Sequence, residues 1–162
     1  MISIKSVEIK ELTPGHAPTF SKCLSEESED YLKHFIPFAE YSEAYIKKIL
    51  SEKKFDKYFG LFAGDEIVGF YMLRGFDAGF EIPSYGVWIS SSYTNKGLSK
   101  LTLYHALSVC RLNNIKTLML KVHPENEIAK NLYEKFGFVK VGIDEKIGHL
   151  IYHKNLANNL SE

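Results

Sequence analysis

The sequence has few of the residues that build covalent or metal-based scaffolds. Only two of its 162 residues are cysteines, Cys23 and Cys110, and neither belongs to a CxxC pair or a Cys/His cluster. This usage argues against a disulfide framework and against structural zinc. The six histidines are scattered without metal-ligand spacing. We therefore expect no metal in this protein.

The chain also lacks an excess of charge of one sign and lacks a long apolar run. Twenty basic residues balance twenty acidic ones without a basic block, so we expect no nucleic-acid partner. No apolar run approaches the roughly 20 residues of a membrane-spanning helix, and residues 1–5 lack the apolar core of a signal peptide. We expect a cytoplasmic protein that has no membrane partner.

What the chain does contain is a regular alternation of strand and helix patterns. With 45% hydrophobic and 25% charged residues, it can bury the core of a single domain over residues 1–162. The patterns predict strands at 4–12, 58–63, 67–73, 85–89, 117–122, 138–143 and 149–153, and helices at 19–25, 42–53, about 96–112 and after Asn126. The acidic and aromatic segment 26–41 has no assignment.

The order of these elements predicts a mixed sheet. Gly64, Asp65 and Glu66 separate two β-rich runs, which indicates a hairpin. The helix between strands 85–89 and 117–122 makes a βαβ crossover, so these two strands should be parallel. The nearly continuous apolar character of 117–122 is typical of a strand covered on both faces.

A polar turn at residues 90–95 leads from a strand into a helix that begins near Gly97. The first N–H groups of a helix have no intrahelical partner, and the helix dipole adds positive charge there, so a diphosphate binds well at such a start. Gly97 allows close approach of a ligand, and Lys96 and Lys100 add charge. An ordinary strand-to-helix connection has the same spacing, so both interpretations stay open here.

The helix after Asn126 carries one tyrosine among its apolar residues. Its predicted apolar face consists of Ile128, Ala129, Leu132, Tyr133 and Phe136. Tyr133 is then either a core residue whose hydroxyl finds one partner or a group that faces a ligand.

Together the two segments resemble the GNAT acetyltransferase superfamily. Its signature, Gln or Arg, two residues, Gly, one residue, then Gly or Ala, corresponds here to Thr94-Asn95-Lys96-Gly97-Leu98-Ser99. Gly97 matches, Ser99 is a small substitute, and Thr94 replaces the long polar residue. The second segment matches at Asn126, Ala129, Leu132, Tyr133, Phe136, Gly137 and Phe138.

The resemblance implies a fold and a co-substrate. The fold class is α/β, an α+β arrangement with a central twisted mixed sheet of about six to seven strands, flanked by about four helices and splayed between the two central parallel strands. The co-substrate is acetyl-CoA, with no metal. The implied coenzyme-binding residues are Val87, Trp88 and Ile89 through their backbone, Thr94, Asn95, Lys96, Gly97, Leu98, Ser99 and Lys100 around the diphosphate, and Asn126 and Tyr133.

The same resemblance assigns catalytic roles. Tyr133 would protonate the departing coenzyme A thiolate, which a phenol with a reference pKa of about 10 can do when it is well placed. The acceptor amine must lose a proton. His123, at the end of strand 117–122 and with an ordinary pKa of about 6.5, is the first candidate base. Glu81 and water are the others, and His123 as a plain loop histidine is the alternative.

We expect an N-acetyltransferase that moves an acetyl group directly to a primary amine of a small molecule, such as an amino sugar or an amino acid derivative. Aromatic residues between 31 and 45 suit a closed acceptor groove. A peptide or protein amino group is one alternative, although Lys121 stands where some peptide acetyltransferases of the family place a glutamate. A non-catalytic acyl-coenzyme A binding module is another, motivated by Thr94 and Ser99. A homodimer is left open.

The acidic residues near position 27 also allow two interpretations. Glu26, Glu27, Glu29 and Asp30 form either a solvated face or a surface that attracts a cationic acceptor.

Overall fold

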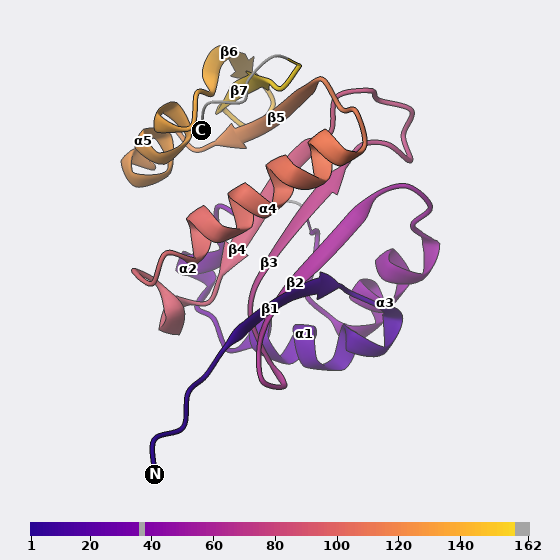
Figure 1. Ribbon diagram of the computed structural model, residues 1–162. Coiled ribbons are helices and arrows are strands. Elements are labelled where there is room, and N and C mark those ends of the chain that lie inside the picture. Colours follow the sequence, from indigo (N-terminus) through magenta and orange to yellow (C-terminus); the bar gives the residue numbers. More distant parts are fainter. Residues whose placement is uncertain (36–37, 158–162) are drawn as a thin grey trace. The chain divides into compact units, whose positions relative to one another are not determined.

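The structure is a computed structural model that describes residues 1–35 and 38–157. Within these residues the strands form one seven-stranded mixed sheet in the order β1-β2-β3-β4-β5-β7-β6 (Figure 1). The strands are β1 (Val7–Glu11), β2 (Lys57–Ala63), β3 (Glu66–Arg74), β4 (Ser84–Ile89), β5 (Thr117–Val122), β6 (Val139–Asp144) and β7 (His149–Asn155). The helices are α1 (Ala17–Ser25), α2 (Glu29–Leu32), α3 (Glu43–Glu52), α4 (Leu98–Leu112) and α5 (Glu127–Lys135), with short 3₁₀ turns at Pro14–His16 and Ser91–Tyr93.

This architecture confirms the predicted fold class. The central strands β4 and β5 pair in parallel through Ser84 with Met119 and Tyr85 with Leu120. The predicted hairpin is β2 and β3, with Gly64 at a φ of 65° in its turn. No helix in the ranges 1–35 and 38–157 is both long enough and apolar enough to cross a membrane.

The structure differs from the sequence prediction at the start of the chain and in segment 26–41. Strand β1 begins at Val7 instead of residue 4, and residues 1–6 are exposed. Segment 26–41 contains a fifth α-helix, α2, which Ser28 caps by accepting a hydrogen bond from the Tyr31 N–H at 3.1 Å. A four-residue helix is too short to show a helical period. Residues 36–37, in the same segment, lie outside the described residues.

The chain divides into two compact units, which are described separately. Unit 1 comprises Met1–Met72 and Val87–Thr102, and unit 2 comprises Leu73–Gly86 and Leu103–Glu162. One domain over 1–162 stays a prediction.

The core of unit 1 lies on both faces of its strands. On one face, α1 and α3 supply Phe20, Leu24, Ile46 and Leu50, which pack with Phe70 of β3 and Trp88 of β4. The Phe70 ring lies 4.8 Å from the Phe20 ring and 5.5 Å from the Phe38 ring, measured between centroids. On the other face, the first residue of α4, Leu98, packs with Leu61, Val68 and Ile89.

Unit 2 holds α5 against its antiparallel strands. Strand β7 pairs with both β5 and β6, and the β6–β7 register shifts between Lys140 and Gly142. The Tyr152 hydroxyl donates to Glu134 of α5 at 3.1 Å. The buried Lys154 ammonium donates to the Phe136 carbonyl oxygen at 2.6 Å, at the end of that helix. Strand β7 therefore fixes the second half of α5.

Phe70→Ala tests the aromatic core of unit 1. Because Phe70 is fully buried, its truncation should lower the free energy of unfolding by about 3–5 kcal/mol. Urea denaturation followed by circular dichroism measures this loss. Leu112→Ala, at a side chain that is 82% exposed, is the control and should change stability by no more than about 0.5 kcal/mol. Equal effects of the two substitutions would contradict the assigned core.

Candidate functional site

The end of β4 is where the predicted coenzyme residues of unit 1 begin. Here the chain leaves the sheet, and its backbone groups find partners in the segment that follows α1. The Ile89 carbonyl oxygen accepts a hydrogen bond from the Tyr31 hydroxyl at 2.6 Å. The Ser91 N–H donates to Glu27 Oε2 at 3.0 Å. The strand end is therefore closed by side chains about 60 positions away in the sequence.

Glu27 accepts two further hydrogen bonds. The indole Nε1–H of Trp88 donates to Glu27 Oε2 at 3.1 Å, and the Ser91 hydroxyl donates to Oε1 at 2.6 Å. Both carboxylate oxygens are thus engaged. The interpretation of the acidic residues as one solvated face is wrong for Glu27, because this side chain turns inward to the end of β4.

The turn between β4 and α4 has the backbone shape expected of a ligand-facing helix start. Asn95 has a φ of 61° and Gly97 a φ of 78°, in the left-handed region that glycine and, to a lesser degree, asparagine tolerate. Helix α4 begins at Leu98, and its first backbone bond joins the Leu101 N–H to the Gly97 carbonyl oxygen at 3.1 Å. A Cβ built on Gly97 would meet no atom within 4 Å. The space in front of this backbone is therefore open.

The other predicted residues of this turn divide into exposed and buried ones. Thr94, Asn95, Lys96, Ser99 and Lys100 are exposed, whereas Leu98 is buried in the core. Leu98 therefore presents only its backbone. The Thr94 hydroxyl donates a long hydrogen bond of 3.4 Å to the Ser91 carbonyl oxygen, within its own turn.

A cavity of about 490 Å³ lies in unit 1 beside this strand end. Its apolar wall consists of side chains that are at most 7% exposed, Leu24, Leu32, Phe35 and Phe38. Glu27 and Glu29 contribute carboxylates to the lining. Because Glu27 also bonds to Trp88 and Ser91, the cavity and the end of β4 share a wall. Cavities of this size suit small organic ligands.

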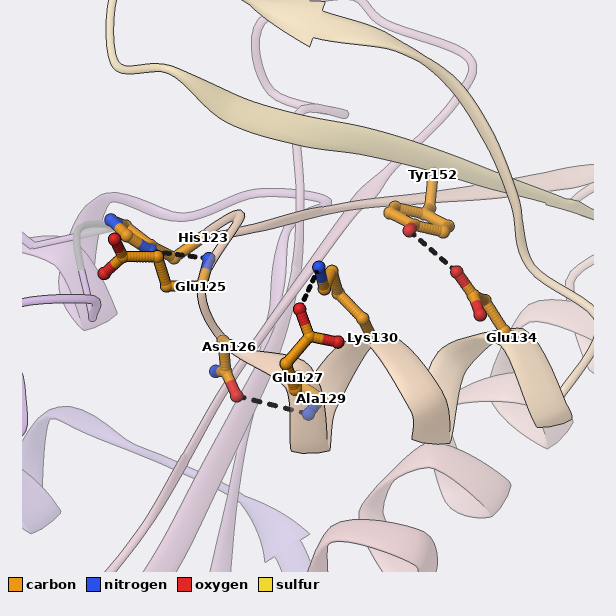
Figure 2. Close-up of polar contacts among 8 residues, drawn as sticks. All are labelled: His123, Glu125, Asn126, Glu127, Ala129, Lys130, Glu134 and Tyr152. Atoms are coloured by element: carbon orange, nitrogen blue, oxygen red, sulfur yellow. Dashed lines mark hydrogen bonds and ion pairs between the residues drawn. The ribbon is translucent and has the colours of Figure 1, made fainter.

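In unit 2, the start of α5 is built as the sequence predicts. Asn126 is the N-cap residue, and its Oδ1 accepts a hydrogen bond from the Ala129 N–H at 3.2 Å (Figure 2). Lys130 and Glu127, one turn apart, form an ion pair at 2.6 Å. Ile128 is 87% exposed, so its predicted place on the apolar face of the helix is wrong. In the first turn of α5, the side of the helix that carries Ile128 faces solvent.

Tyr133 lies on the buried side of α5. It is 8% exposed, and its ring meets the ring of Phe138 edge-on at 5.8 Å. Burial raises the pKa of the Tyr133 hydroxyl to about 12. The side chain is therefore a neutral hydrogen-bond donor throughout the physiological pH range.

His123 follows β5 directly, at the loop that leads to α5. Its Nδ1 accepts a hydrogen bond from the Glu125 N–H at 3.1 Å (Figure 2). A neutral imidazole that accepts at Nδ1 carries its proton at Nε2. The His123 ring also meets the buried His149 ring edge-on at 5.4 Å. In this tautomer, His123 presents a donor at Nε2.

Glu81 and Lys121 complete the predicted positions in unit 2. Glu81 is exposed in the loop before β4. The Lys121 ammonium forms an ion pair with Asp144 of β6 at 2.8 Å, and this hydrogen bond holds the pKa of the Asp144 carboxyl below its ordinary value. Lys121 thus joins β5 to β6.

A comparison with models of known protein families identifies the family to which this chain belongs. A sequence model of the acetyltransferase (GNAT) family matches residues 16–138, well over half of the chain. The chain belongs to the GNAT acetyltransferase family. It is therefore an acyltransferase that uses acetyl-CoA as its co-substrate, as the sequence predicts. A search of curated proteins by sequence gives no match.

Solved GNAT structures share the fold. The ribosomal-protein-S5-alanine acetyltransferase of Vibrio fischeri has a TM-score of 0.78 at 17% identity, with 96% of this chain and 98% of that chain covered. The PaiA N-acetyltransferase of Thermoplasma acidophilum, in complex with coenzyme A, has a TM-score of 0.73 at 21% identity, covering 93% and 99%. Mutant forms of the spermidine/spermine N-acetyltransferase SpeG of Vibrio cholerae have a TM-score of 0.73 at 15% identity, with 94% of this chain and 96% of that chain covered.

Sequence reasoning considered Glu27 only as part of an acidic surface, and it did not predict the bonds that Glu27 and Tyr31 make to the end of β4. Each bonds to a residue 58 to 64 positions away, and no local pattern reports such a contact. The one available signal was their position in an acidic and aromatic segment that has no regular period.

Proposed function

We propose that this GNAT protein is an N-acetyltransferase that moves the acetyl group of acetyl-CoA directly to the primary amine of a small molecule with an apolar body. The observation that supports this proposal most directly is the 490 Å³ cavity, which has a buried apolar wall. Glu27 lines this cavity and also accepts a hydrogen bond from Trp88 at the end of β4. The apolar body of the acceptor would lie against Leu32 and Phe35. The lining also carries the carboxylates of Glu27 and Glu29 and the ammonium of Lys33, which pairs with Asp30 at 3.0 Å, and the two carboxylates would attract the acceptor's ammonium.

The coenzyme would be held by backbone groups more than by side chains. The N–H groups at the start of α4 would bind the diphosphate, with Lys96 and Lys100 supplying charge in place of the long side chain that Thr94 lacks. Backbone groups of Val87, Trp88 and Ile89 would pair with the pantetheine arm, as an added strand does. The amide NH₂ of Asn126 is the donor left to that arm, because its Oδ1 caps α5.

The transfer itself forms one bond and breaks one. The neutral amine nitrogen attacks the thioester carbonyl carbon, the C–N bond forms, the C–S bond breaks, and the amine proton leaves. Tyr133 donates a hydrogen bond to the sulfur as negative charge develops there and supplies its proton to the thiolate. Because burial raises its pKa to about 12, Tyr133 is a weaker acid than a free phenol, so its main contribution before the C–S bond breaks is the hydrogen bond to the sulfur.

We propose water as the immediate acceptor of the amine proton. His123 Nδ1 already accepts the Glu125 N–H, so His123 would have to give up this bond to act as a base. Glu81 is exposed and can receive the proton only as a solvated carboxylate.

An acceptor panel tests the proposed substrate class. Thiol release from acetyl-CoA is measured with small arylalkyl amines, amino sugars, polyamines and peptides that have a free amino terminus. The highest kcat/KM should belong to the small amines that have an apolar body, because the cavity wall is apolar. Turnover of peptides alone would contradict the proposal and favour the protein-acetylating alternative. Coenzyme binding without turnover of any acceptor would favour the non-catalytic alternative.

Tyr133→Phe tests the acid. This substitution keeps the ring packing on Phe138 and removes only the hydroxyl, so kcat should fall by about 100-fold or more. The dissociation constant of coenzyme A, measured by titration calorimetry, should stay within about threefold of the wild-type value. Tyr104→Phe, at a side chain that is 49% exposed, is the matched control and should leave kcat unchanged. Equal turnover in Tyr133→Phe and wild type would defeat the assigned role.

His123→Asn tests the base. An asparagine side chain can accept the hydrogen bond from the N–H two residues later, so it preserves the turn, but it cannot take up a proton. With water as the acceptor, kcat/KM should stay within about threefold of wild type between roughly pH 6 and 9. A fall of about 100-fold, together with loss of the acidic limb of the pH profile, would show instead that His123 is the base.

A further inference from the structure

The Glu27 carboxylate accepts three hydrogen bonds from other parts of unit 1. It lies between α1 and α2, is partly buried, and accepts hydrogen bonds from the Trp88 indole, the Ser91 N–H and the Ser91 hydroxyl. The shortest of these, 2.6 Å from the Ser91 hydroxyl to Oε1, has the length of a charge-assisted bond. One side chain thus bonds both to Trp88, near the end of β4, and to Ser91, the first residue of the 3₁₀ turn that follows.

Each donor that meets Glu27 requires a partner. The Trp88 side chain is 4% exposed, and a buried indole N–H without an acceptor is costly. The Ser91 N–H has left the sheet and therefore has no strand to pair with. Replacing Glu27 by an apolar residue leaves the buried Trp88 indole N–H without its acceptor. The donors of the exposed Ser91 turn to water instead, so the loop is no longer held to the segment after α1.

Tyr31, in the same segment as Glu27, also forms a hydrogen bond to the end of β4. Its hydroxyl donates to the Ile89 carbonyl oxygen at 2.6 Å. Burial, followed by the nearby Glu27 charge, raises the pKa of the Tyr31 hydroxyl, so this donor stays protonated. Residues 27 and 31 together fix the path of the chain from Trp88 to Ser91.

We propose that Glu27 is a positioning residue for acetyl transfer, which holds the end of β4 and the start of the diphosphate-binding turn in place while its own carboxylate forms part of the acceptor cavity wall. Glu27 does not touch the reacting atoms. The roles of the turn and of the cavity rest on the proposed function, whereas the ties to Trp88 and Ser91 are present in the structure itself.

Two substitutions at Glu27 separate positioning from a general loss of structure. In Glu27→Gln, the amide oxygen can accept from Trp88 and from the Ser91 N–H, and the amide NH₂ can donate to the Ser91 hydroxyl oxygen, so every bond has a neutral counterpart. In Glu27→Ala all are lost. Glu26→Ala, at the exposed neighbouring residue, is the control.

The first readout needs neither coenzyme nor acceptor. Trp88 is the only tryptophan of the chain, so its indole N–H gives one peak in a ¹⁵N–¹H correlation spectrum. This peak should move upfield in Glu27→Ala and much less in Glu27→Gln. An unmoved peak in Glu27→Ala would mean that the hydrogen bond is absent in solution and would overturn the proposal.

The second readout is binding and turnover. Coenzyme A should bind about tenfold more weakly to Glu27→Ala, and kcat with the best amine should fall by about 10- to 100-fold. Glu27→Gln should lose clearly less than Glu27→Ala in both measurements, and the control Glu26→Ala should stay within about threefold of wild type. Wild-type coenzyme affinity and kcat in Glu27→Ala, with the Trp88 peak shifted, would also overturn the proposal.

Two further outcomes are distinguishable. If no amine is acetylated, the proposed function fails, but the weaker coenzyme binding of Glu27→Ala still supports the positioning role. If Glu27→Ala does not fold, Tyr31→Phe carries the test, since it removes a single oxygen. It should weaken coenzyme binding by about threefold or more, and unchanged binding and kcat in Tyr31→Phe would then count against the proposal.

Discussion

The backbone of a chain that leaves a β-sheet must find new hydrogen-bond partners, and unit 1 is organised by this requirement at the end of β4. The Ile89 carbonyl oxygen, the Ser90 N–H and the Ser91 N–H meet Tyr31, the Val68 carbonyl oxygen and Glu27 respectively. These partners bring the segment after α1 to the strand end. The wall of the cavity and the path into α4 both follow from that arrangement.

The predicted coenzyme residues of unit 1 and of unit 2 have different physical surroundings. In unit 1, the groups available to a ligand are polar, namely the N–H groups of a helix start, an open glycine and two lysines, all of which salt would screen in solution. In unit 2, Tyr133 is buried and its ring packs against Phe138, and burial raises the pKa of its hydroxyl, which stays protonated. The surroundings in unit 1 favour an anion, and those in unit 2 favour a neutral hydrogen-bond donor.

The sequence was sufficient to predict the structure where a hydrophobic pattern is long, or where a backbone conformation or helix cap strongly favours one residue type. Strand β5 has the predicted bounds, Gly97 takes the positive φ that its place in the motif requires, and Asn126 caps α5. Sequence failed where the deciding partner is remote or the element is short. Helix α2 has a single turn, Ile128 faces solvent although its spacing is apolar, and the bonds of Glu27 and of His123 Nδ1 depend on how the folded chain orients each side chain.

The division of the chain into two units has an evolutionary consequence. The sequence passes from one unit to the other after Met72, after Gly86 and after Thr102, which are positions inside β3, β4 and α4. Neither unit is therefore a contiguous stretch of the chain, and no single recombination breakpoint in the gene would transfer one of them whole. The part that carries the cavity and the part that carries Tyr133 therefore have to be inherited together, and variation in either is expected to arise by point substitution more readily than by exchange of modules.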